Sequence, residues 1–127
     1  MVEFAIILPL LLLILVGILD MGRLLLAQAM VTNAAREGAR MAALGYTGAQ
    51  LQARVNESLP GIATLAGGST VVVNLSCPTV PTPTSNAAVT VSTTGFTWVA
   101  LDGITGLFGA AIDTPQPSSR ASMRCSG

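Results

Sequence analysis

The sequence contains no histidine and no lysine, and only 9% of its residues are charged. Without histidine, neither a Ser-His-Asp nor a Cys-His catalytic set can form, and the commonest metal ligand is missing. The six acidic residues are scattered, with no close pair placed for general acid and base catalysis. Two cysteines alone cannot close a zinc site. We therefore expect a protein without enzymatic activity, metal or cofactor.

The charge pattern gives no indication of a polyanionic ligand. The formal net charge is zero, and aromatic residues make up only 4% of the chain. There is no basic patch with interleaved aromatic residues and no glycine-rich phosphate loop between a strand and a helix. We expect no nucleic-acid partner.

The hydrophobic fraction reaches 51%, and much of it gathers at the start of the chain. Residues 4–19 are apolar without interruption, apart from Pro9 and Gly17. No basic region precedes Phe4 and no small-residue cleavage site follows Leu19, so this is not an ordinary cleaved signal peptide. As a helix the run would be about 24 Å long, against about 30 Å for the bilayer hydrocarbon. A membrane span and the apolar core of an assembly both remain open.

A proline lies inside this apolar run, and two charged residues follow it. Asp20 and Arg23 are spaced to pair on one helix face, and apolar residues resume at Leu24. A helix that continues past Asp20 could span the bilayer with this pair near an interface. Pro9 removes one backbone hydrogen bond and predicts a kink or local unwinding. It either lies near enough to the helix start to have little effect, or adapts the helix to packing in a bundle.

Good helix formers extend the predicted helix to about Leu44, where residues 45–48 end it. Small residues recur at four-residue spacing and form a stripe that another helix can approach closely: Ala34, Gly38 and Ala42. Arg36 and Arg40 stack on one face. They form either a solvated edge or a set of contacts between subunits.

The rest of the chain predicts a small α+β head. Thr47 can cap a short helix over 48–59. Alternating and β-branched segments then predict an antiparallel sheet, with strands over 70–77, 88–94 (extended toward Trp98) and 118–125. Leu107 and Phe108 are expected in the core or at an interface. The organisation is a hydrophobic N-terminal helix (1–45) followed by an extracytoplasmic head domain (46–127).

Cys77 and Cys125 each end a predicted strand. In the cytosol they would be free thiols, but the membrane-type N-terminus favours export and therefore a disulfide. Closing that loop is worth on the order of 4 kcal/mol in the chain-entropy treatment. Asn56 and Asn74 begin N-glycosylation triplets that chance readily supplies, and Asn74 lies inside a predicted strand. The sequence does not decide whether either is modified.

Several segments together resemble the TadE-like family, which comprises pilins or pseudopilins of the tight-adherence (Tad) branch of type IV pili. They are residues 2–9 (VEFAIILP), 17–23 (GILDMGR) and 33–40 (NAAREGAR). The tail from Leu107 through residues 121–124 is similar more loosely. The resemblance implies a precursor cut by a prepilin peptidase after a glycine on the cytoplasmic side.

The resemblance also assigns a role to Glu3. It matches the family's glutamate near the mature N-terminus, which there stands at the fifth position. We therefore expect Met1 to be an internal residue of the precursor, with the mature start slightly earlier. In type IV filaments, the partner of this glutamate is held to be the N-terminal amine of a neighbouring subunit. A lone carboxylate in an apolar setting requires such a partner, and the pairing could register subunits during extraction from the membrane.

The leading hypothesis is thus a structural pilus subunit, either a major or a minor component. It would wait in the bacterial inner membrane as a single-pass protein, meet an assembly platform there, and join other copies or other pilins in an extracellular helical filament. The alternative is a permanent single-span accessory subunit of a larger membrane complex.

Overall fold

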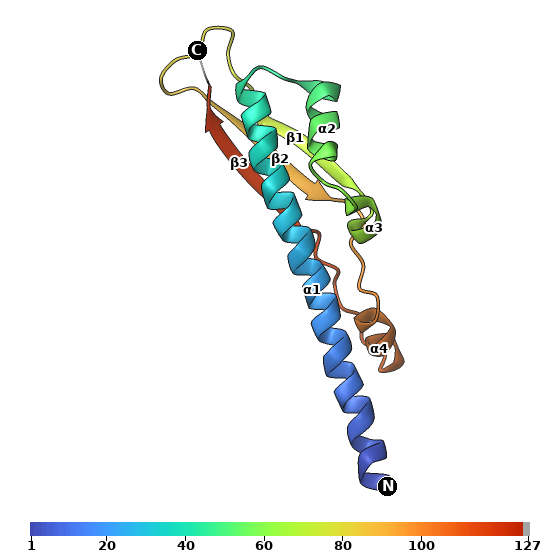
Figure 1. Ribbon diagram of the computed structural model, residues 1–127. Coiled ribbons are helices and arrows are strands. Elements are labelled where there is room, and N and C mark those ends of the chain that lie inside the picture. Colours follow the sequence, from blue (N-terminus) through green and yellow to red (C-terminus); the bar gives the residue numbers. More distant parts are fainter. Residues whose placement is uncertain (126–127) are drawn as a thin grey trace.

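The computed structural model describes residues 1–125 and confirms the predicted α+β class. A long helix runs from the N-terminus into a small domain of helices and strands (Figure 1). In chain order the elements are α1 (Val2–Ala43), α2 (Gly48–Glu57), α3 (Ile62–Ala66), β1 (Ser69–Leu75), β2 (Asn86–Thr93), α4 (Leu101–Leu107) and β3 (Ser118–Arg124).

Helix α1 is continuous over 42 residues and includes Pro9. The local unwinding expected at this proline does not occur, because the ring removes a single backbone hydrogen bond from a helix whose other turns remain intact. Pro9 lies well inside the helix rather than in its first turn. The helix ends at Ala43, close to the predicted end at Leu44.

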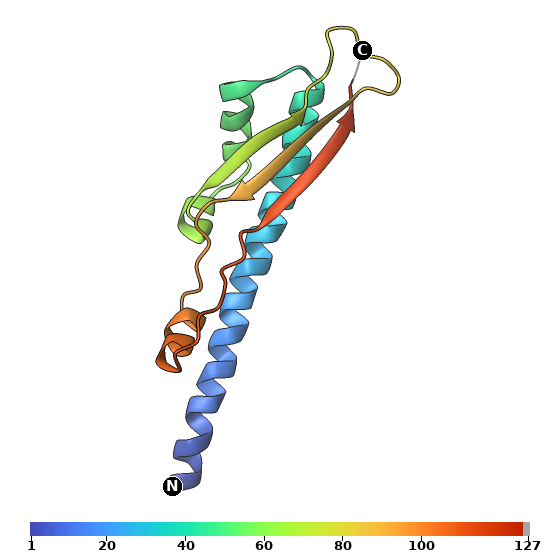
Figure 2. The same cartoon turned by 180° about the vertical axis from the view of Figure 1, so that it is seen from behind.

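The three strands form one antiparallel sheet in the order β1-β2-β3. In the central strand, Val89 pairs with Val73 on one side and Ala121 on the other. Helix α1 lies across one face of this sheet, and Figure 2 shows the sheet from the opposite side. Most side chains on the covered face are apolar, with Thr93 among the buried exceptions, whereas Thr70 and Thr90 point to the other face. Period-two alternation therefore explains why this face was buried.

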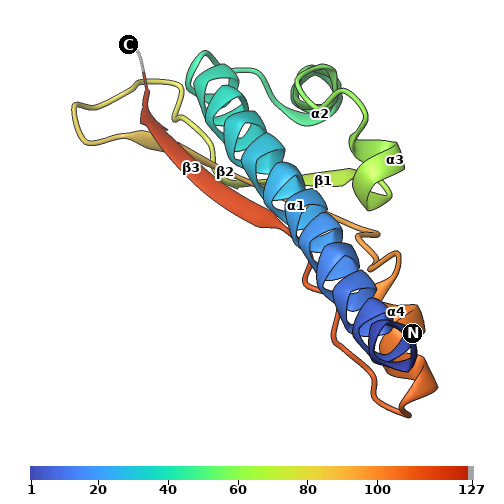
Figure 3. The ribbon, with the colours of Figure 1, turned by 60° about the horizontal axis from the view of Figure 1, so that its bottom comes forward.

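The core of the head forms where the second half of α1 meets the sheet and α2. Its largest fully buried side chains include Phe96, Leu51, Val31, Val55 and Val89. These residues come from both sides of residue 45, so α1 supplies one wall of the head as well as the free N-terminal helix. Figure 3 shows α1 crossing the sheet with α2 beside it.

Several predicted details are wrong. Thr47 occupies the N-cap position of α2, but its side chain makes no capping hydrogen bond. The prediction for the central strand extended too far, because β2 ends at Thr93 and the chain then leaves the sheet. Of the two places expected for Leu107 and Phe108, the core is wrong, since they are 84% and 81% exposed, and the interface stays a prediction. The short helices α3 and α4 were not foreseen as helices.

The predicted disulfide joins Cys77 to Cys125, with a Cα–Cα distance of 5.8 Å. Cys77 follows β1 and Cys125 follows β3, so the bridge links the ends of the two outer strands. It also fixes the start of the proline-containing loop between β1 and β2 beside the end of the chain. The bridge therefore ties the sheet together at the end far from the N-terminus of α1 (Figure 1).

Candidate functional site

The first half of α1, residues 2–19, is apolar apart from Glu3, and the head leaves it exposed except at the half-buried Val16 and Gly17. We call it the bare half of α1. Phe4 is 70% exposed, Leu11 55% and Leu19 68%. The most apolar 18-residue window of α1 has a mean hydropathy of 2.9, and none of it is buried. By length and composition, α1 can cross a membrane. From Ala27 onward, by contrast, one side of the same helix is buried in the head.

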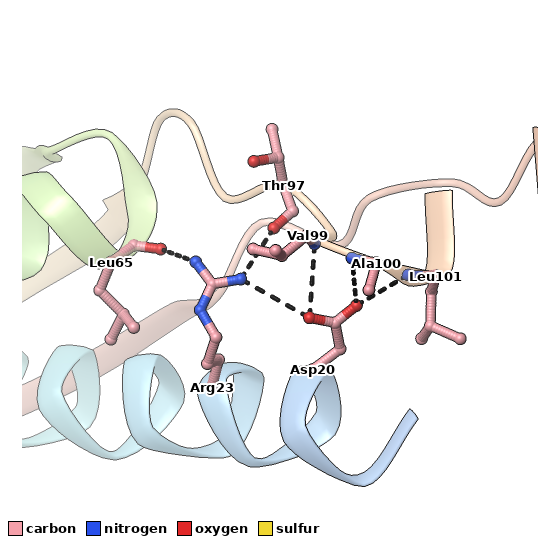
Figure 4. A network of polar contacts seen from close by, with 7 residues as sticks. All are labelled: Asp20, Arg23, Leu65, Thr97, Val99, Ala100 and Leu101. Carbon is pink, nitrogen blue, oxygen red and sulfur yellow. Dashed lines mark hydrogen bonds and ion pairs between the residues drawn. The ribbon is translucent and has the colours of Figure 1, made fainter. Parts of the chain in front are cut away.

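Asp20 marks the boundary between the bare and the covered half. It is only 2% exposed. Its carboxylate accepts hydrogen bonds from three consecutive backbone N–H groups, those of Val99 (3.3 Å), Ala100 (3.1 Å) and Leu101 (2.9 Å). Leu101 begins helix α4, so the carboxylate lies where the positive end of that helix dipole favours an anion. Asp20 is thereby satisfied inside its own chain (Figure 4).

Arg23 lies beside Asp20 and binds the same segment of the chain, residues 96–101, which runs back along α1 from the sheet to α4. We call it the returning segment. Its Nη1 lies 3.7 Å from Asp20 Oδ1 and donates to the carbonyl of Thr97 at 3.4 Å, while Nη2 donates to the carbonyl of Leu65 at 3.3 Å. The guanidinium also lies 5.7 Å from the centre of the buried Phe96 ring. A planar fork with several donors suits two carbonyls and a ring face together.

We call these two residues the polar clamp, because together they hold residues 96–101 against the middle of α1 (Figure 4). An open groove of about 270 Å³ lies beside the polar clamp, and its wall is mostly apolar. Val16, Leu19 and Val99 line it together with the clamp residues and Ala100. The groove opens on the bare half of α1, so it extends that apolar surface to the returning segment.

The sequence predicted the Asp20–Arg23 pair, and the structure places the two side chains together. The position of this pair near a membrane interface stays a prediction. In the structure, both side chains chiefly bind backbone groups of residues distant in sequence. Thr97 and Val99 carry no signal of this role, since they contribute only main-chain atoms. The one local hint is a pair of opposite charges in an otherwise apolar stretch.

Glu3 lies in the exposed first turn of α1, at the far end of the bare half. Within residues 1–125, no cation forms an ion pair with it. The structure therefore does not bring Glu3 near the polar clamp. Its registering role stays a proposal.

The small-residue stripe has its partners within the chain. Ala34, Gly38 and Ala42 are all buried. A methyl group added to Gly38 would lie 3.1 Å from Val55 Cγ2 of α2 and 3.2 Å from Val89 Cγ1 of β2. A small residue is therefore needed at Gly38, because α2 and the sheet of the same chain pack closely against it.

The remaining candidates lie on the head surface. Arg36 and Arg40 are exposed, and Arg40 forms a long ion pair of 4.0 Å with Glu37. The side chain of Asn56 accepts a hydrogen bond from Gln52 at 3.0 Å, and that of Asn74 bonds to Thr90. Throughout residues 1–125, His, Cys, Asp and Glu form no group that could hold a metal ion.

In a comparison with known protein families, residues 1–40 match the family described as TadE-like protein. The match covers the whole bare half of α1, the polar clamp and most of the part of α1 that packs in the head. No curated protein and no solved structure matches the chain. The match and the apolar helix fit a subunit associated with the Tad pilus.

Proposed function

We propose that the chain is a structural subunit, a pilin or a minor pseudopilin, of a Tad-type type IV pilus. Before assembly, α1 holds it in the bacterial inner membrane as a single-pass protein. After cleavage by a prepilin peptidase and passage through an inner-membrane assembly platform, it joins other copies or other pilins in an extracellular filament.

The main observation that supports this function is the division of α1 into a bare and a covered half. An exposed apolar surface as long as residues 2–19 is not stable in water and requires lipid or protein around it. The covered half packs in the core of the head. The bare half is rigidly joined to the covered half, because the helix is continuous. A single rigid helix can therefore be surrounded first by lipid and later by neighbouring helices, without any change in the fold of the head.

The head has the features of a domain that works outside the cytosol. Its disulfide suits an oxidising compartment. Its three-stranded sheet presents threonine and serine side chains on the face opposite α1. These features support a filament in which α1 forms the core and the sheet faces outward.

Electron microscopy separates this function from the alternative of a permanent accessory subunit. Sheared surface fibres from cells that produce the protein are labelled with an antibody to the head. A pilin or pseudopilin gives label on thin fibres, along their length for a major component and at their ends for a minor one. Label confined to membranes, with unlabelled fibres present, contradicts the filament role and supports the accessory subunit.

The role proposed for Glu3 has its own test. Glu3→Ala should leave a folded, membrane-held protein that no longer enters fibres, because the registering charge is lost. Glu57→Ala is the matched control, since Glu57 is an exposed acid of the head whose ion pair is with Arg54 of the same helix, at 3.1 Å. Normal entry of the Glu3→Ala protein into fibres would refute the registering role.

A further inference from the structure

Helix α4 and the residues that follow it lie beside the bare half of α1, away from the rest of the head (Figures 1 and 2). Leu101 Cδ2 is 4.0 Å from the position that a Cβ on Gly17 would occupy. At the other end of α4, Leu107 and Phe108 are 84% and 81% exposed. We call these two side chains the α4 tip. The last residue of this seven-residue helix and the C-cap residue that follows it thus carry two large apolar side chains away from the core.

Both ends of α4 have partners for backbone groups that a helix end usually leaves open. At its start, the amides of Ala100 and Leu101 bind the Asp20 carboxylate. At its end, Gly109 adopts a positive φ of 71°, which lets the Ala110 amide donate back to the Thr105 carbonyl at 3.0 Å. Satisfied backbone groups lower the free-energy cost of placing this turn in a medium poorer in water.

Charge is excluded from the same part of the segment. Asp102 and Asp113 bracket it, and residues 103–112 carry no charge. The Trp98 indole donates to the Asp113 carbonyl at 3.2 Å, so the chain returns to the level of the polar clamp at Asp113. Tryptophan and charged residues therefore gather at one level of α1, and the uncharged α4 tip lies beyond it toward the N-terminus. This order matches a membrane surface, where tryptophan favours the interface.

We propose that, in the membrane-held form, the α4 tip inserts into the head-side leaflet of the bilayer, with the polar clamp and Trp98 at its surface. This inference rests on the proposed function, because it needs α1 to span the membrane. At about 1.5 Å per residue, the seven residues of α4 span at most about 10 Å, which is within the depth to which interfacial helices bury their apolar face.

The size of the tip favours lipid over a second copy of the chain as its partner. An aromatic side chain buries about 150–250 Å². Two side chains therefore fall well below the roughly 800 Å² per partner of a stable protein interface. A leaflet, in contrast, can accept a small wedge that α1 already holds in place.

The test places one tryptophan at a time in the full chain, reconstituted with one copy per lipid nanodisc. Trp98 is the chain's single tryptophan, so Trp98→Phe provides an unlabelled background. Phe108→Trp reports on the tip, Leu11→Trp on the proposed span, and Val72→Trp on the outer sheet face as the control. If the Trp98→Phe protein does not fold, the three tryptophans are introduced with Trp98 retained. The emission of the unmodified protein is then subtracted from that of each variant. The readout is loss of emission on replacing the lipid with one brominated in its acyl chains.

Insertion predicts that the Phe108→Trp protein loses emission much as the Leu11→Trp protein does, while the Val72→Trp protein loses none. If the Leu11→Trp protein is quenched but the Phe108→Trp protein behaves like the Val72→Trp control, the tip lies in water. The insertion is then refuted while α1 still spans the bilayer. If neither the span variant nor the tip variant is quenched, the insertion and the membrane stage both fail.

A second quencher distinguishes lipid from another copy of the chain as the partner of the tip. Aqueous acrylamide is added to the Phe108→Trp protein in discs that hold one copy and in discs that hold several. Insertion predicts that the tip tryptophan is shielded equally in both. Shielding only in discs with several copies would assign the tip to a second copy and refute insertion.

Discussion

The carboxylate of Asp20 in α1 accepts a hydrogen bond of 2.9 Å from the backbone amide of Leu101, 81 positions later in the chain. This contact joins the end of the N-terminal apolar run to the start of α4. It holds the start of α4 against the middle of α1, at the boundary between the bare and the covered half. Apart from the side on which α4 lies, the part of α1 on the N-terminal side of Asp20 is left for lipid or neighbouring subunits.

Removing the Asp20 carboxylate should release the returning segment. Asp20→Ala deletes acceptors for three amides, and hydrogen bonds to a charged group contribute about 1.5–3 kcal/mol each. Hydrogen exchange of the amides of Val99, Ala100 and Leu101 should accelerate strongly, whereas amides of β2 should keep their protection. Asp113→Asn is the control, because that acid is exposed. Unchanged protection of the three amides would show that Asp20 does not hold the segment.

Arg23 should not be replaceable by lysine. Arg23→Lys retains the charge but loses the fork that reaches both Leu65 and Thr97. We expect a loss of about 0.5–1.5 kcal/mol in the free energy of unfolding, measured by chemical denaturation with Trp98 emission as the signal. Arg36→Lys, at an exposed site of the same helix, should have no measurable effect. Equal stability of the two variants would contradict the contacts assigned to Arg23.

Packing at Gly38 should be intolerant of a side chain. Gly38→Leu would force atoms against Val55 and Val89, and overpacking typically costs about 1–3 kcal/mol. Gly22→Leu is the matched control, since no atom lies within 4 Å of a Cβ added there. Denaturant midpoints of the two purified proteins give the comparison. If Gly38→Leu is as stable as Gly22→Leu, the stripe does not pack against α2 and the sheet.

Opening the disulfide should destabilise the head without unfolding α1. The Cys77–Cys125 bridge closes a separation of 48 residues, and the chain-entropy treatment expects a loss of about 4 kcal/mol when it is reduced. The denaturation midpoint is measured with and without reductant. Cys77→Ser with Cys125→Ser should show the reduced stability under both conditions. Two reactive thiols in the unreduced native protein would contradict the bridge.

The sequence predicted the parts of the fold that local patterns specify. Helix propensity and the glycines after Leu44 located the end of α1, and alternation in residues 88–94 located the central strand. The disulfide followed from two cysteines at predicted strand ends. Helix α3 was missed because five residues between Gly61 and Gly67 are too few for a period to emerge.

The candidate site was harder to predict for a physical reason. Asp20 and Arg23 were recognisable as a pair, but their main partners are backbone groups, which every residue carries. No pattern in residues 97–101 distinguishes amides that meet a carboxylate from amides that meet water. Likewise, the stripe at Gly38 predicted close approach by a neighbour, but spacing alone does not say whether the neighbour is α2, β2 or another chain.

The central claim is that the bare half of α1 passes from lipid into the core of a filament. It is tested most directly by a photo-crosslinking amino acid at Leu11, which is 55% exposed on that half. Sheared fibres and membranes are irradiated separately, with unirradiated samples as the control. The account predicts covalent adducts with pilin subunits in the fibre fraction. Protein that is present in fibres yet forms no adduct from Leu11, or that occurs only in the membrane fraction, would contradict it.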